Sequence, residues 1–228
     1  MSARETLPPR GERAADRRDR AITLMSYLHE AYPDAACALT YATPFQLLIA
    51  TILSAQCTDE RVNMVTPVLF AQFPEPEDLA AADIQQVEDV VRSTGFFRQK
   101  AKNIQAAARM LLDRYDGDLP TTVDELAQFP GAARKTANVV VSNCFPEQAS
   151  GIAVDTHVQR IARRLGLTRA WTPPEIEREL MRVIPRESWN DVTHLLIDHG
   201  RAVCRARKPL CGECPLAELC PSNTRFVS

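Results

Sequence analysis

Four cysteines near the C-terminus are spaced closely enough to bind one metal centre. They follow the pattern C-x6-C-x2-C-x5-C: Cys204, Cys211, Cys214 and Cys220. Zinc sites usually show two short C-x2-to-4-C pairs, so this spacing favours an iron–sulfur site, although zinc accepts the same four thiolates. The other cysteines are dispersed in apolar or helical surroundings, and we expect them to be small buried hydrophobic residues: Cys37, Cys57 and Cys144.

A short basic loop separates the first two of these cysteines. It contains Arg205, Arg207 and Lys208. A rigid metal centre that fixes this loop would present its cations to a phosphate backbone. We therefore expect the centre to have an architectural role in binding, without redox turnover.

A second candidate site lies at residues 126–137, which read LAQFPGAARKTA. A capped helix is expected to end at Pro130-Gly131, and a second helix to begin at once. This pattern predicts a helix-hairpin-helix, whose turn amides and second-helix N-terminus can hold a DNA phosphate without reading sequence. Ala133 and Arg134 complete the expected DNA-contacting turn.

Lys135 falls in the first turn of the expected second helix. The positive end of the helix dipole, the neighbouring Arg134 and partial burial would each disfavour the charged amine there. A lysine with a larger neutral fraction can act as a nucleophile. The alternative is an ordinary lysine that faces solvent.

An acidic residue follows an apolar segment twenty residues later. Asp155 comes directly after residues 152–154 and precedes an expected helix that carries Val158 and Ile161. An aspartate in this position caps the helix N-terminus. Capping is compatible with a second role as a catalytic carboxylate.

Short helices separated by prolines must position these residues. Glycine is scarce and Ala-, Leu-, Glu- and Arg-rich stretches recur, which predicts an all-α protein. One helix is expected from Ala21 to the residue before Pro33, and about six in residues 37–147, in a compact bundle with short loops. Several helix starts carry capping residues: Thr43, Asp83, Thr122 and Thr172.

The charge is unevenly distributed along the chain. Residues 1–129 carry 13 Lys and Arg against 19 Asp and Glu, whereas residues 130–228 carry 14 against 10, so only the second part is basic. Residues 1–20 are expected to form a disordered tail. No membrane span or signal peptide is evident, which predicts a cytoplasmic protein with reduced thiols and no membrane partner.

Taken together, these residues resemble the endonuclease III family of helix-hairpin-helix DNA glycosylases. The resemblance covers roughly residues 21–221 and is carried by residues 53–59, 129–137 and 154–157 and by the four-cysteine motif. It implies a six-helix barrel at 37–147 that contains the hairpin. It also implies a [4Fe-4S] cluster domain formed by 21–36 and 148–228, with the active site between the two domains.

The resemblance also implies an activity. Lys135 matches the lysine nucleophile and Asp155 the catalytic aspartate of a base excision repair enzyme that removes oxidised pyrimidines and cleaves the strand 3′ to the site. Gln56 matches the residue that fills the gap left by a flipped base, and Phe96 occupies the wedge position. Two further residues within these motifs are expected to support the site: Asp59 and His157.

The implied partner is double-stranded DNA with damaged bases or abasic sites. The implied state is a monomer, associated with the nucleoid if the source is bacterial. Two residues depart from the family pattern. Ala133 replaces the second hairpin glycine, which would strain the turn if the site needs a positive φ and would not if the turn has adjusted. Phe96 replaces a leucine and could change opposite-base preference.

Three other functions compete with this one. A monofunctional glycosylase would use Asp155 and water, but such relatives lack a lysine at position 135. A DNA-binding or redox-sensing module would retain hairpin and cluster with an inert Lys135. An electron-transfer protein would need a second cofactor or docking partner, which nothing in the sequence suggests. Borohydride trapping on abasic DNA separates these alternatives.

Overall fold

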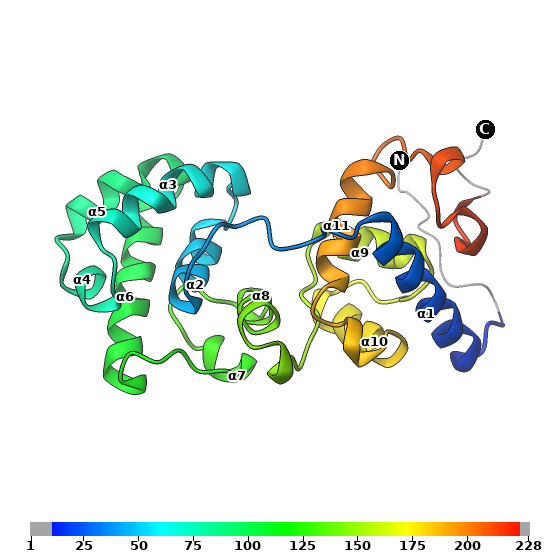
Figure 1. Ribbon diagram of the computed structural model, residues 1–228, viewed down its shortest axis with the longest axis horizontal. Coiled ribbons are helices and arrows are strands. Elements are labelled where there is room, and N and C mark those ends of the chain that lie inside the picture. Colours follow the sequence, from blue (N-terminus) through cyan, green and yellow to red (C-terminus); the bar gives the residue numbers. More distant parts are fainter. Residues whose placement is uncertain (1–10, 224–228) are drawn as a thin grey trace. The chain divides into compact units, whose positions relative to one another are not determined.

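The computed structural model describes residues 11–223, and all its regular elements in that range are helices (Figure 1). The all-α prediction is confirmed. The chain forms two compact units: unit 1 comprises residues 1–36 and 151–228, and unit 2 comprises residues 37–150. The sequence predicted that residues 37–147 form one domain, so the predicted second boundary lies three residues before the one observed. No helix in the described range is long and apolar enough to cross a membrane.

Unit 2 contains seven α-helices, of which six have at least six residues and the seventh, α7, has four. The helices are α2 (Pro44–Leu53), α3 (Asp59–Gln72), α4 (Pro76–Ala81), α5 (Ile84–Val91), α6 (Phe97–Tyr115), α7 (Val123–Leu126) and α8 (Arg134–Cys144). Two 3-10 turns accompany them: η1 (Arg92–Thr94) and η2 (Pro146–Gln148). The expectation of about six helices was therefore close.

Helix α2 forms the centre of unit 2. Eight of its ten residues are buried, and it packs against α3, α6 and α8. A helix that is apolar on all sides is stable only when other helices surround it. Its start is fixed by Thr43, whose hydroxyl accepts a hydrogen bond from the Gln46 amide at 3.2 Å. The predicted caps at Asp83 and Thr122 are also present.

Unit 1 has its own apolar core, formed by one N-terminal helix and three C-terminal helices. They are α1 (Ala14–Ala31), α9 (Thr156–Arg164), α10 (Pro173–Val183) and α11 (Val192–Ala202). Three 3-10 turns follow or separate them: η3 (Arg186–Ser188), η4 (Cys211–Glu213) and η5 (Ala217–Leu219). Thr172 precedes α10 as predicted, but its hydroxyl contacts the Glu175 carboxylate and not a backbone amide.

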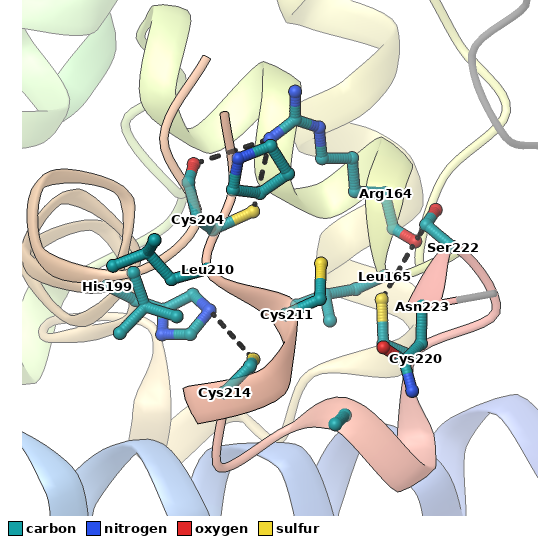
Figure 2. Close-up of a pocket in the computed structure, with 13 residues that line it drawn as sticks. Arg164, Leu165, His199, Cys204, Leu210, Cys211, Cys214, Cys220, Ser222 and Asn223 are labelled. Carbon is teal, nitrogen blue, oxygen red and sulfur yellow. Dashed lines mark hydrogen bonds between the residues drawn. The ribbon is translucent and has the colours of Figure 1, made fainter. Parts of the chain in front are cut away.

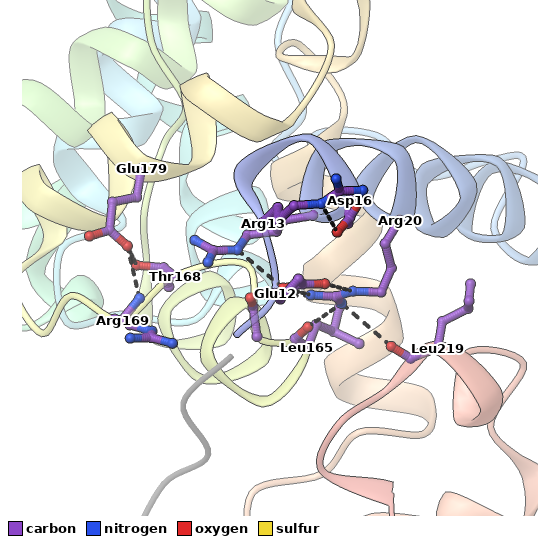
Figure 3. Close-up of polar contacts among 11 residues, drawn as sticks. Glu12, Arg13, Asp16, Arg20, Leu165, Thr168, Arg169, Glu179 and Leu219 are labelled. Atoms are coloured by element: carbon purple, nitrogen blue, oxygen red, sulfur yellow. Dashed lines mark hydrogen bonds and ion pairs between the residues drawn. The ribbon is translucent and has the colours of Figure 1, made fainter. Parts of the chain in front are cut away.

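The predicted disordered tail is wrong for residues 14–20, which are the first turns of α1. Arg20 anchors this segment, because its guanidinium donates to the Leu165 carbonyl at 2.6 Å and pairs with Glu12 at 2.8 Å (Figure 3). Burial acts to raise the pKa of Glu12, but the hydrogen bonds and charges of Arg20 and Arg17 outweigh it and hold that pKa below its usual value. Residues 1–10 lie outside the described range.

Candidate functional site

The predicted hairpin is present in unit 2 and consists of α7, a turn at residues 127–133 and α8. Gly131 makes the turn possible, because it has a φ of +81° and a Cβ there would lie 2.8 Å from Asn103 Nδ2 and 2.9 Å from Ile52 Cγ2. Only glycine satisfies both the backbone angle and the close approach. Phe129, just before the turn, is buried and stacks on Tyr115.

Ala133 resolves the two alternatives left open by the sequence. It is the N-cap of α8 with φ −86° and ψ 171°, an extended conformation that any residue adopts. The hypothesis of left-handed strain at this position is therefore wrong. In the part of the chain that the structure describes, the amides of Gly131 and Ala133 donate to no other group, so they are free to bind an anion.

Lys135 is the second residue of α8 and is exposed, so the predicted partial burial is wrong, although its amine is accessible, as that of an attacking residue must be. Its surroundings include Cys37 and Asp59. Burial raises the pKa of the Cys37 thiol, the charge of Asp59 adds to this effect, and Lys135 opposes it. The charges of Asp59, at the start of α3, and Lys135, at the start of α8, therefore both influence the pKa of the half-buried Cys37 thiol. Arg134, beside the lysine, pairs with Asp124 at 3.4 Å.

Three exposed residues of unit 2 other than glycine have left-handed backbones, and one of them, Asp116 (φ 52°), is the C-cap of α6. Gln56, in the turn after α2, has a φ of 54°, and Phe96, at the start of α6, has a φ of 46° with 71% of its surface exposed. Such conformations are uncommon for residues other than glycine and concentrate at functional sites. Gln56 and Phe96 are the positions that the family resemblance assigned to insertion into DNA.

Asp155 lies in unit 1, where it caps α9. Its Oδ1 accepts a hydrogen bond from the Val158 amide at 2.8 Å, so the predicted capping role is present. The preceding segment is fixed by the buried Thr193, whose hydroxyl donates to the Ala153 carbonyl at 2.9 Å. Burial lowers the pKa of His157, and the charge of Asp155 opposes that effect.

The four C-terminal cysteines line one pocket of unit 1 (Figure 2). Within residues 11–223, no three His, Cys, Asp or Glu side chains form a group that could hold a single metal ion. Zinc would need its thiolates within about 2.3 Å of one centre. A [4Fe-4S] cluster binds each thiolate to a different iron atom, so four cysteines that line one pocket without converging on a single point fit the cluster.

Arginine and histidine side chains surround the cysteines. Arg164 donates to the Cys204 thiol at 3.4 Å and to the backbone carbonyls of Arg205 and Ala206 at 2.7 and 2.8 Å. It therefore holds the start of the basic loop, while the side chains of Arg205, Arg207 and Lys208 are exposed. On the other side, Nε2 of the buried His199 lies 3.8 Å from the Cys214 thiol.

The cysteine thiols are buried enough to resist ionisation by themselves. Burial, followed by the charges of the neighbouring cysteines, raises the pKa of Cys214 to about 11. Burial is also the largest cause of the raised pKa values of Cys211 and Cys220. A positively charged iron centre removes this obstacle, because thiolates are stabilised by direct coordination.

Several residues of the site were missed by sequence reasoning. Thr193, Arg164 and His199 act through contacts between segments that are far apart in the chain. Lys100, a buried lysine of α6, contacts the turns that carry Gln56 and Phe96. A lysine in an amphipathic helix gave no signal of burial, since such residues usually face solvent.

The fold and these sites define a helix-hairpin-helix protein with a four-cysteine metal-binding segment. Residues 49–186 match the model of the HhH-GPD superfamily base excision DNA repair proteins, and residues 204–220 match that of the iron–sulfur binding domain of endonuclease III. Endonuclease III of Synechocystis sp. is 55% identical over 91% of this chain and 94% of its own length, and that of Bacillus subtilis is 47% identical over 83% and 86%.

Solved structures agree with these relatives. A trapped endonuclease III–DNA covalent intermediate matches with a TM-score of 0.85 at 43% identity, over 92% of this chain and 99% of that one. A non-covalent endonuclease III–DNA complex matches with a TM-score of 0.84 at 44% identity, over 91% and 97%. The chain belongs to the endonuclease III family of the HhH-GPD superfamily, and its cofactor is a [4Fe-4S] cluster.

Proposed function

We propose that this chain is a bifunctional DNA glycosylase and abasic-site lyase that removes oxidised pyrimidines from duplex DNA. The observation that carries the proposal is Lys135, an exposed amine in the first turn of the helix that follows the Pro130-Gly131 turn. Since the substrate is chromosomal DNA and the relatives are bacterial, the proposed place of action is the cytoplasm, at the nucleoid, and the proposed state is a monomer.

Lys135 would act as the nucleophile. Its neutral amine attacks C1′ of the flipped nucleotide, and the N-glycosidic bond breaks as the base leaves with the bonding electrons and a proton. The sugar ring then opens as O4′ takes the proton that Asp155 removed from the lysine ammonium, and Lys135 holds C1′ as a protonated Schiff base. This cation acidifies the C2′ proton, and loss of that proton expels the 3′ phosphate by β-elimination.

Asp155, a residue of unit 1, would assist Lys135. Its carboxylate takes a proton from the lysine ammonium and balances the positive charge that develops on the sugar. The hydrogen bond to the Val158 amide leaves the second carboxylate oxygen available for this work. Asp59 and His157 are proposed to support this site.

Contacts with the DNA backbone would come from both units. In unit 2, the turn formed by Pro130, Gly131, Ala133 and Arg134 offers amides to one phosphate. Gln56 and Phe96 would enter the base stack there. In unit 1, the ligands proposed for the cluster are Cys204, Cys211, Cys214 and Cys220, and the cluster would fix the loop of Arg205, Arg207 and Lys208 against the backbone.

Two substitutions test the chemical roles. Lys135→Gln should abolish strand cleavage on duplexes with thymine glycol, dihydrouracil or an abasic site, whereas Lys102→Gln, at an exposed lysine of α6, should cleave normally. Asp155→Asn retains a good N-cap, so it removes only the charge, and most base excision should be lost while DNA binding remains. Strand cleavage by the Lys135 variant, or near-normal excision by the Asp155 variant, would refute the assigned role.

A further inference from the structure

Lys100 is a buried cation in the middle of unit 2. It lies in the first turns of α6 and is 4% exposed. Its Nζ donates to two backbone carbonyls, that of Leu53 at 2.8 Å and that of Thr94 at 2.7 Å. Within residues 11–223 it has no carboxylate partner, so these carbonyls are what compensates its burial.

Both carbonyls belong to helix ends. Leu53 is the last residue of α2, and Thr94 is the last residue of η1. The final carbonyls of a helix have no partner within it, and they carry the negative end of the helix dipole. In the part of the chain that the structure describes, neither carbonyl accepts a hydrogen bond from another donor. The Lys100 ammonium therefore supplies the hydrogen-bond donor for the last carbonyl of both helices.

The chain leaves these two helix ends toward Gln56 and Phe96, two residues with left-handed backbones. Gln56 follows Leu53 by three residues, and Phe96 follows Thr94 by two. The backbone amide of Lys100 also donates to the Phe96 carbonyl at 3.1 Å. Lys100 is therefore bonded directly to the start of one turn and to both sides of the other.

Burying a charged side chain in this space costs more free energy than burying an apolar one. Burial lowers the pKa of Lys100, which reflects the cost of desolvating its charge. A methionine of similar length would fill the volume without that cost. What methionine lacks is a head group that bonds both carbonyls and so fixes the distance between the two turns.

We infer that Lys100 is a positioning residue that sets the spacing of the Gln56 and Phe96 turns, so that both side chains enter the duplex together as the damaged base is extruded. This inference rests on the proposed function. The side chain touches neither DNA nor the reacting atoms, and its effect is confined to the step in which the base pair opens.

The test compares two duplexes that differ in the work of opening. In one, thymine glycol is paired with adenine; in the other, it lies opposite an abasic analogue, so the stack is already disrupted. Lys100→Met should lose on the order of 10- to 100-fold in the single-turnover excision rate on the paired duplex, and much less on the pre-opened one. With 2-aminopurine beside the lesion, the fluorescence increase on binding should also be reduced.

Controls separate this effect from loss of the fold or of the activity. Lys102→Met removes an exposed lysine two residues away and should leave both rates unchanged. In a Gln56→Ala, Phe96→Ala background, Lys100→Met should add no further loss. If wild-type protein excises neither substrate, the proposed function fails, whereas normal wild-type excision with equal losses on both duplexes overturns only the role of Lys100.

A second variant covers the case in which Lys100→Met melts below the assay temperature. Lys100→Gln keeps a donor that is too short to reach both carbonyls, so the same comparison should give an intermediate loss on the paired duplex. An unchanged ratio of the two rates would overturn the inference. Failure of both variants to fold would assign Lys100 to stability alone and would also overturn it.

Discussion

The hairpin of unit 2 and the cysteine segment of unit 1 are held in place by different forces. Around the hairpin, Phe129, Ala132 and Leu126 are buried, and Gly131 lets the turn pack directly on Asn103 and Ile52. In the described residues 204–223, Leu216 is the one buried apolar residue. The hairpin is therefore shaped by packing, whereas the cysteine segment depends on its ligand and on hydrogen bonds from arginines.

The difference teaches where each of the two elements that we propose to contact DNA gets its rigidity. An apolar core specifies the hairpin without any cofactor, because interiors pack densely and tolerate little displacement. A segment with one buried apolar residue cannot offset its own chain entropy, so the free energy of ligation becomes free energy of folding. Substitutions at three positions test this contrast, from the largest expected effect to the smallest.

Cys211→Ser should have the largest effect. We expect insoluble protein, or soluble protein without the broad visible absorption of an iron–sulfur cluster, because one of four ligands is lost. Cys144→Ser is the matched control, since this half-buried thiol lies in unit 2 and should leave the absorption unchanged. A soluble Cys211→Ser protein with full absorption and activity would show that the segment does not depend on its ligand.

Gly131→Ala should disrupt the hairpin through packing. The left-handed backbone and the clash with Asn103 and Ile52 together predict a loss of about 3 kcal/mol in the free energy of unfolding. Gly117→Ala is the control, because Gly117 has a φ of +89° but no atom closer than 4.0 Å to its added Cβ, so about 1 kcal/mol is expected. Equal losses in urea denaturation would mean that close packing does not shape the turn.

Substitutions at Ala133 should have the smallest effect. Ala133→Ser supplies the side-chain cap that α8 lacks and should stabilise the protein by about 1 kcal/mol. Ala133→Gly should change stability by less than about 0.5 kcal/mol, because a better N-cap offsets the added entropy of the unfolded chain. Duplex affinity of the glycine variant, measured at two salt concentrations, should equal that of wild type; tighter binding would restore the idea of a strained turn.

The sequence predicted the elements that depend on local rules. The caps at Thr43 and Thr122, the Pro130-Gly131 turn and the start of α8 follow from the preferences of a few neighbouring residues. The start of α1 was misplaced because charged residues at positions 12–20 resembled a tail. The partners that order them, such as the Leu165 carbonyl for Arg20, are 145 residues away in the chain.

The candidate site shows the same limit. Spacing identified the four cysteines, but not His199 or Arg164, which approach them from α11 and α9. Nor could spacing show that Ala133 has an ordinary extended backbone while Gly131 alone provides the left-handed residue of the hairpin. Such facts depend on how distant helices pack, which no short pattern records.

The amine of Lys135 is proposed to form the covalent link to DNA. Wild-type protein incubated with an abasic duplex and sodium borohydride should give a stable protein–DNA adduct, because the reductant traps a Schiff base. Peptide mass mapping of that adduct should place the modification on Lys135. An adduct on any other residue, or no adduct with protein that still removes the damaged base, would contradict the account.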